Sequence, residues 1–488
     1  MTDANANASF VRKEMLAEQT PPVTAAGPVK WLRENLFSSW FNGILTILSL
    51  YVIYWVLSHV IGWLVFGIWD AGSLTECRAV RDELYGEGAS VACWAVIGER
   101  WNQLMFGFYP PAWELIAGLF HAEELAARGG LEAVLGQGAD ATARGEFITY
   151  LRENTSVVTV LFLGYWRPMA AFFLFIIAVA PVLFERAPRG LLYFTPIAPF
   201  VCYWLLWGGT IWGPIFVALG FALPWAALKY GPQLVGSLGS TIAAFVLPIL
   251  YWLTLAGPLA SVVGSALPIG IEYIPSDDFG GFMLAFIIGF TGIILSLPLG
   301  VVLALGRQSD LFIINKSCVF FIEVIRGIPL IVWLFTASLL LNYFLPPGTN
   351  FDLMLRVIIM VTLFASAYIA EVVRGGLAAL PRGQYEGADS LGLDYWQSMR
   401  LIILPQALKI SIPGIVNTFI GLFKDTTLVV FIGLLDPIGL SNAIRATTDW
   451  NGIYWELFIF IGLCFFICCY SMSRYSQFLE RKLRREHR

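Results

Sequence analysis

Charged side chains are scarce in this sequence of 488 residues: Asp, Glu, Lys and Arg together make up 13% of it, whereas soluble domains carry about 25%. Histidine is rare as well, with three scattered residues, so no metal site is indicated. The phosphate-binding pattern GxxxxGK[ST] does not occur, and the chain is therefore not expected to bind and hydrolyse ATP by itself. These shortages leave no candidate catalytic residue.

Apolar residues are abundant instead, at 58% of the sequence, with a mean hydropathy of +0.73. Several stretches without Asp, Glu, Lys or Arg exceed the roughly 20 residues that a helix needs to cross a bilayer. Membrane β-barrels show alternation over about 10 residues rather than unbroken apolar runs. The sequence therefore predicts an all-α, polytopic membrane protein. The uncharged stretches are residues 41–69, 191–228, 230–271 and 281–305.

Short basic segments set the expected orientation, because Lys and Arg collect on the cytoplasmic side of membrane proteins. Lys30 and Arg33 place the start of the chain inside, and Arg186 and Arg189 mark a second inner loop. About ten spans satisfy this alternation and leave both termini in the cytoplasm. They are expected near 41–66, 166–185, 281–305, 317–343, 353–373, 411–433 and 454–473, with three more inside 191–271.

The expected topology divides the chain into four regions. The first residues lack the apolar core of a signal peptide, so they are expected to form a mobile cytoplasmic tail. The regions are this tail (1–40), an N-terminal membrane region of about five spans (41–275) with an external loop (68–152), a C-terminal membrane region (276–476) with a cytoplasmic loop (375–410), and a basic cytoplasmic tail (477–488).

The external loop holds two of the seven cysteines, Cys77 and Cys93. Because that compartment is oxidising, a disulfide between them is one expectation, and two unpaired thiols are the other. After Pro110 the loop alternates Ala and Leu with Glu and Arg at helical spacing, but glycine pairs interrupt it. A short amphipathic helix and a mobile loop are both compatible with that pattern.

Charged residues inside predicted spans are candidates for a translocation path, because charges at hydrocarbon depth are costly and usually face partners or water-filled cavities. Glu323 and Arg326 are three residues apart, so they share a helix face on which they can pair. Gly327 and Pro329 follow directly. A glycine and a proline loosen or kink a helix, and irregular backbone at this depth is tolerated where it lines a cavity.

Lys424 and Asp425 interrupt another predicted span near its middle. With Glu323 and Arg326 they would supply the anionic and cationic partners that a zwitterionic substrate needs. The alternative is that both pairs are buried ion pairs or contacts between helices in a subunit interface. Glu371 and Arg374 lie at the inner end of a span, where they are expected to shape the turn into the next loop rather than touch substrate.

The cytoplasmic loop is polar and has helical spacing. Residues 384–391 are expected to form one short helix, Gly392 permits a sharp turn, and residues 395–401 are expected to form a second helix that ends before Pro405. Two short helices joined by a turn favour docking into a groove of a soluble partner.

The segment QYEGADSLGLDYWQSMRLIILPQ, residues 384–406, resembles the E-A-A-x3-G-x9-I-x-L-P loop of ATP-binding-cassette (ABC) importer permeases. The sequence around it, from about 280 to 475 and including EVIRGIPLIVWLF, is similar to the polar amino acid branch of that family. The resemblance implies a five-helix permease core of the type I importer fold at the C-terminal side. The coupling residues of the family correspond to Glu386, Gly387, Ala388, Gly392, Leu404 and Pro405.

Gly387 stands where the family usually has Ala, which should soften the loop helix by up to about 1 kcal/mol. Upstream, VACWAVIGERWNQLMFGFYP and the WRP at 166–168 resemble long-chain permeases of glutamate, glutamine, aspartate and asparagine importers or of general L-amino acid importers. In that subgroup a permease pairs with a second permease.

The resemblance implies further partners and a mechanism. The partners are the second permease, two copies of a cytoplasmic ATPase that binds ATP and Mg²⁺, and an external amino acid-binding protein, with no cofactor on this chain. The implied mechanism is alternating access in the inner membrane. A stand-alone secondary transporter or channel is the alternative, although no inverted repeat typical of that class is evident. A membrane scaffold subunit is a third interpretation.

Overall fold

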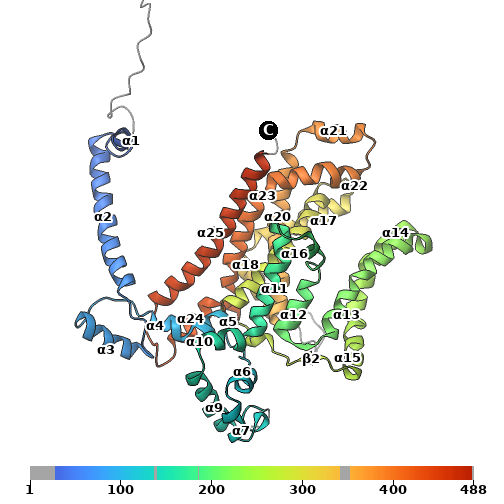
Figure 1. The fold of residues 1–488 in the computed structure, drawn as a ribbon. Coiled ribbons are helices and arrows are strands. Elements are labelled where there is room, and N and C mark those ends of the chain that lie inside the picture. The colour runs from blue at the N-terminus through green and yellow to red at the C-terminus, as the bar shows by residue number, and fades with distance from the viewer. Residues whose placement is uncertain (1–27, 137–139, 185, 341–351, 486–488) are drawn as a thin grey trace, which may run out of the picture. The chain divides into compact units, whose positions relative to one another are not determined.

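A computed structural model describes residues 28–136, 140–184, 186–340 and 352–485, which are helical almost throughout (Figure 1). Most of the expected N-terminal tail lies outside these residues, as does the end of the span expected at 317–343. Two short strands, β1 (Gly209–Thr210) and β2 (Gly270–Ile271), pair antiparallel. The all-α fold class predicted from the sequence is confirmed.

The described residues divide into two compact units. The first contains the chain up to Ala71 together with Thr75–Ala95, and the second contains Gly72–Leu74 and the chain from Val96 onward.

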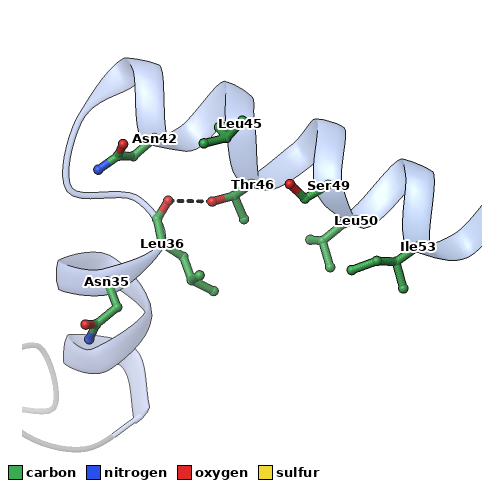
Figure 2. Close-up of a pocket in the computed structure, with 8 residues that line it drawn as sticks. All are labelled: Asn35, Leu36, Asn42, Leu45, Thr46, Ser49, Leu50 and Ile53. Atoms are coloured by element: carbon green, nitrogen blue, oxygen red, sulfur yellow. Dashed lines mark hydrogen bonds between the residues drawn. The ribbon is translucent and has the colours of Figure 1, made fainter. Parts of the chain in front are cut away.

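One long apolar helix dominates the first unit. α2 (Trp40–Val65) begins at Ser39, whose hydroxyl accepts a hydrogen bond from a backbone N–H of the first turn, and none of its residues is buried. The short α1 (Pro28–Asn35) precedes it. Figure 2 shows the shallow groove in the corner between the two helices, where the Thr46 hydroxyl donates to the Leu36 carbonyl at 2.7 Å.

The first unit also contains a disulfide. Cys77, on α3 (Leu74–Tyr85), is bonded to Cys93 with the Cα atoms 6.2 Å apart. The Trp94 ring next to it packs against Trp63 near the end of α2, with ring centroids 5.8 Å apart. Of the two states that the sequence left open, the structure has the bonded one.

In the second unit, residues 113–136 and 140–154 form a small helical lobe. Phe147 and Leu151 are completely buried in its own hydrophobic cluster. The pair Gly129 and Gly130 therefore separates two short helices rather than preventing helix formation, and the helical alternative is the one observed. The helices of this segment and its flanks are α4 (Ala95–Glu99), α5 (Trp101–Phe106), α6 (Trp113–Phe120), α7 (Ala122–Ala127), α8 (Leu131–Val134), α9 (Ala141–Asn154), α10 (Val157–Thr159) and η1 (Val160–Gly164).

Seven helices of the described residues are long and apolar enough to cross a membrane, or up to nine if each of two bent pairs is one span. The remaining elements are α11 (Trp166–Leu183), η2 (Arg189–Tyr193), α12 (Ala198–Trp207), α13 (Trp212–Gly220), α14 (Ala222–Thr254), α15 (Ala256–Ala266), η3 (Ser276–Asp278), α16 (Gly281–Arg307), α17 (Phe312–Gly327), α18 (Leu330–Phe335), η4 (Thr336–Leu340), α20 (Leu353–Ala378), α21 (Arg382–Ser390), α22 (Tyr395–Ser398), η5 (Met399–Ile403), α23 (Leu404–Asp425), η6 (Thr426–Ile432), α24 (Pro437–Arg445) and α25 (Trp455–Arg485).

Two regions differ from the expected spans. Of the three spans expected within 191–271, one corresponds to α12, whose 10 residues are too few to cross hydrocarbon alone. The span expected at 317–343 is broken: α17 and the run Leu330–Leu340 meet at 102°. The physical reason for the break is Pro329, which has no backbone N–H to continue the hydrogen-bond ladder of α17.

The core of the second unit forms where α20 lies between α16 and α23. Small residues allow these helices to approach closely. A Cβ atom on Gly300 of α16 would come within 2.5 Å of Ile369 on α20, and one on Gly376 would come within 2.5 Å of the Ala407 carbonyl on α23. By contrast, a Cβ atom on the neighbouring Gly375 would meet no atom within 4 Å.

We predict opposite effects for alanine at these two adjacent glycines. Gly376→Ala should lower the stability by about 1–3 kcal/mol, because the new methyl group overlaps α23. Gly375→Ala should leave stability unchanged or raise it by up to about 1 kcal/mol, since alanine favours helix. Heating the purified variants and following the monodisperse fraction by size-exclusion chromatography measures the difference. Equal midpoints for the two variants would contradict the close packing.

Candidate functional site

The loop between α20 and α23 contains the residues matched to the coupling motif. α21 carries Glu386, Gly387 and Ala388, of which Ala388 is 1% exposed and packs inward while Glu386 is exposed. Gly392 then adopts a φ of +70°, a conformation that side chains other than glycine rarely take. Both the first short helix and the sharp turn lie where the sequence predicted them.

The second short helix of the loop starts with a complete capping box. The Asp394 carboxylate accepts a hydrogen bond from the Gln397 N–H at 2.8 Å, and the Gln397 side chain accepts one from the Asp394 N–H at 3.3 Å. The two ends of the loop are joined by Gln406, whose amide donates to the Gln384 side chain at 2.8 Å. The loop is therefore a defined helical hairpin.

The prediction that the second helix ends before Pro405 is wrong. α22 runs through the π-helical turn η5 into α23, and Leu404 and Pro405 form the first turn of α23. A proline is accommodated there because it needs no N–H partner in the first turn of a helix, and a π turn shifts the hydrogen-bond register just before it.

The loop presents large apolar side chains to its surroundings. Leu391 is 74% exposed, Trp396 71% and Leu401 64%. A loop surrounded only by water gains no stability from exposing three large apolar side chains. Groups of exposed apolar side chains mark surfaces that bind other proteins. Figure 1 shows α21 and α22 at the end of the second unit, beyond the ends of α20 and α23.

Five charged residues meet where α16, α17 and α20 approach the loop, and we call them the arginine cluster. One oxygen of Glu371 accepts from Arg307 at 2.6 Å, and the other accepts from Arg374 at 2.9 Å. Arg326 lies 3.7 Å from Glu371, and Glu323 lies 3.0 Å from Arg307. Three guanidinium groups from three helices therefore surround one carboxylate.

The cluster corrects one expectation about pairing. Glu323 and Arg326 share α17 but do not pair with each other: Glu323 pairs with Arg307, and Arg326 with Glu371. Glu371, which was expected to shape the turn into the next loop rather than touch substrate, is the central member. Its side chain is 15% exposed, against 56% for Glu323, so Glu371 is the carboxylate on which the cluster depends.

Lys424 and Asp425 lie apart from the arginine cluster. They end α23, and within the described part of the chain no salt bridge joins either residue to Glu323 or Arg326. The adjacent hydroxyl of Thr427 donates to the Lys424 carbonyl at 2.9 Å, so it is used within the turn. The structure thus divides the four path candidates into two separate places.

Sequence reasoning missed Arg307 as a member of the site. Arg307 and Glu371 are 64 positions apart in the chain, so no local pattern signals their contact. For Arg374 a signal was present, because it follows Glu371 by three residues and therefore shares its helix face.

Comparison with known proteins shows the same family along the whole chain. Residues 296–485 match the family described as binding-protein-dependent transport system inner membrane component. A glutamate/glutamine/aspartate/asparagine transport system permease protein of Rhodobacter capsulatus is 51% identical over 486 residues, covering 98% of this chain and 99% of that protein.

Two further relatives extend the comparison. An inner membrane amino-acid ABC transporter permease of Escherichia coli is 33% identical over 93% of this chain and 92% of its own length. A probable glutamine ABC transporter permease of Bacillus subtilis is 32% identical over 41% of this chain and 90% of its own length. The shorter relative matches only part of the chain, whereas the two longer ones match nearly all of it. This chain therefore belongs to the family of amino-acid ABC transporter permeases.

Proposed function

We propose that this permease imports polar and acidic amino acids, namely glutamate, glutamine, aspartate and asparagine or a wider set of L-amino acids. The relative from Rhodobacter capsulatus, which matches the chain over 98% of its length, supports this substrate class. Under this proposal the transport is driven by ATP and proceeds by alternating access in the inner membrane.

The proposed assembly contains a second permease subunit, two copies of an ATP-binding subunit and an external amino acid-binding protein. ATP and Mg²⁺ bind to the ATPase, and this chain needs no cofactor of its own. The observation that carries the proposal is the helical hairpin of the loop, with exposed Leu391 and Trp396 beside Glu386. An apolar surface on two short helices suits a groove in a soluble partner.

In this proposal the coupling residues act through the hairpin. Glu386, Gly387 and Ala388 form the helix that enters the ATPase, and Gly392 gives the hairpin its sharp turn. Leu404 and Pro405 connect it to α23, so movement of the hairpin moves a membrane helix. Glu323 and Arg326 in one place, and Lys424 and Asp425 in the other, are the proposed contacts of the translocation path.

We further propose the topology expected from the basic segments. Both termini lie in the cytoplasm, residues 276–476 form the permease domain with its coupling loop at 375–410, and the loop 68–152 is external. The disulfide of Cys77 with Cys93 supports an external position for that loop, because disulfides persist in oxidising compartments.

Reconstitution tests the function directly. Vesicles are prepared that contain this chain, its second permease and its ATPase. They should take up labelled glutamate only when ATP is present on the side of the membrane that carries the ATPase and binding protein is present on the opposite side. Uptake that needs an ion gradient but no ATPase would instead identify a secondary transporter.

Gly392→Val should uncouple ATP hydrolysis from transport. Valine at a φ of +70° is strained by about 1–2 kcal/mol, so the hairpin should rearrange while the membrane core stays folded. We expect ATPase activity to persist and uptake to fall at least several-fold. Gly387→Ala is the matched control, because Gly387 has a negative φ within α21 and no atom within 4 Å of its Cβ position. Normal uptake by Gly392→Val would refute the role of the turn.

Glu371→Gln should lower the stability of the protein more than Glu323→Gln does. Removing the carboxylate of Glu371 leaves three guanidinium groups without their shared partner, which should destabilise the protein by about 3 kcal/mol. Glu323 is more than half exposed, so its loss should cost less than about 1 kcal/mol. Thermal unfolding of the purified proteins compares them. A Glu323 variant that unfolds as early as the Glu371 variant would argue against Glu371 as the centre of the cluster.

Thiol labelling under denaturing conditions should reveal the disulfide as a difference in the number of labelled cysteines with and without reductant. With maleimide we expect five labelled cysteines without reductant and seven with it, since five cysteines are free in the structure and the sequence contains seven. Intact mass spectrometry gives the count. The double variant Cys77→Ser with Cys93→Ser should give five in both conditions. Seven labelled thiols without reductant would contradict the disulfide.

A further inference from the structure

Arg326 has the weakest partner of the three arginines in the cluster. Both oxygens of Glu371 are already engaged by Arg307 and Arg374 at hydrogen-bond distance, and Arg326 approaches only to 3.7 Å. Its Nε–H is buried without a hydrogen-bond partner among the described residues. A buried donor left unpaired costs about 1–3 kcal/mol, so an additional acceptor beside Arg326 would be stabilising.

The charge of the cluster points to an anion. Three arginines and two glutamates leave an excess of one positive charge. Glu323 does not offset this excess near Arg326, because its carboxylate faces Arg307 and is 56% exposed. Charges that are partly removed from water need a counter-ion close by. The space next to Arg326 therefore favours a negatively charged group.

The backbone beside Arg326 is open to its surroundings. α17 ends directly after it, and the bend of 102° to Leu330–Leu340 leaves Gly327 and Pro329 exposed. The guanidinium carbon of Arg326 lies over the Tyr368 ring of α20, 5.4 Å from the ring centroid, which is a cation–π contact. Breaks between apolar helices commonly line substrate sites in transporters, and the exposed Gly327 and Pro329 leave a ligand access to this arginine.

We propose that Arg326 binds the α-carboxylate of the transported amino acid. The proposal rests on the function proposed above and names the substrate group that this site takes. Glutamate, glutamine, aspartate and asparagine differ in the charge of their side chains but share the α-carboxylate, so one cation at this position serves all of them. A planar guanidinium matches a carboxylate with two parallel hydrogen bonds, which an ammonium group cannot do.

Equilibrium binding to the purified complex tests the proposal. The complex of this chain with its second permease and ATPase is placed in nanodiscs of zwitterionic lipid, without binding protein, and titrated with labelled glutamine. Arg326→Gln should weaken binding by tenfold or more, and Arg326→Lys should give an intermediate loss. Lys316→Gln removes the same charge from an exposed position 10 residues earlier on α17 and should bind as wild type does.

Competition identifies the substrate group involved. Glutaminamide lacks the α-carboxylate, so on the wild-type complex it should compete at least tenfold less well than unlabelled glutamine. On Arg326→Gln that difference should largely disappear. A difference of the same size in both proteins would overturn the assignment of Arg326 to this carboxylate.

Other outcomes also overturn the proposal. If wild-type complex shows no saturable glutamine binding, or Arg326→Gln binds equally well, the site does not hold substrate. If Arg326→Gln no longer retains the second permease on affinity purification, the arginine pairs with that subunit. If added phosphatidylglycerol displaces glutamine from the wild type, a lipid phosphate occupies the site. ATP-driven uptake by the wild-type assembly tests the importer function separately from all of these.

Discussion

Three guanidinium groups can lie together between α16, α17 and α20 only because the carboxylate of Glu371 lies among them. Like charges repel strongly where water is partly excluded. The close approach of α16 and α20 through Gly300 brings Arg307 near enough to reach that carboxylate. Helix packing and charge are thus linked: the small residues bring the arginines together, and one acidic side chain makes their proximity tolerable.

The arginine cluster lies close along the chain to the helical hairpin. α20 continues for four residues after Arg374 before it ends at Ala378, and the hairpin follows. A shift of the hairpin that moves α20 therefore acts first on the salt bridges of Glu371. In the proposed importer, this arrangement places Glu323 and Arg326 next to the element that transmits movement from the ATPase.

The sequence was sufficient to predict the fold class, the hairpin and most membrane helices, because those features depend on local patterns. Unbroken apolar runs predict spans, and the turn residue Gly392 between two segments of helical spacing predicts the hairpin. The end of the second hairpin helix was predicted incorrectly, since nothing local shows that a π turn would carry the chain past Pro405. The prediction that Glu323 and Arg326 pair was wrong for a different reason. The partners that they have instead, Arg307 and Glu371, are distant in sequence and near in space.

The π turn at Met399–Ile403 has a mechanical consequence. It joins the exposed Trp396 to Asp425 through one helical rod of about 30 residues, which at 1.5 Å per residue is about 45 Å long and has one backbone hydrogen bond missing at Pro413. A rod of about that length that tilts as one piece by roughly 5° about one end displaces its far tip by about 4 Å. A small rocking of the hairpin would in this way be amplified into a displacement of atomic size at the opposite end of the rod, where Lys424 and Asp425 lie.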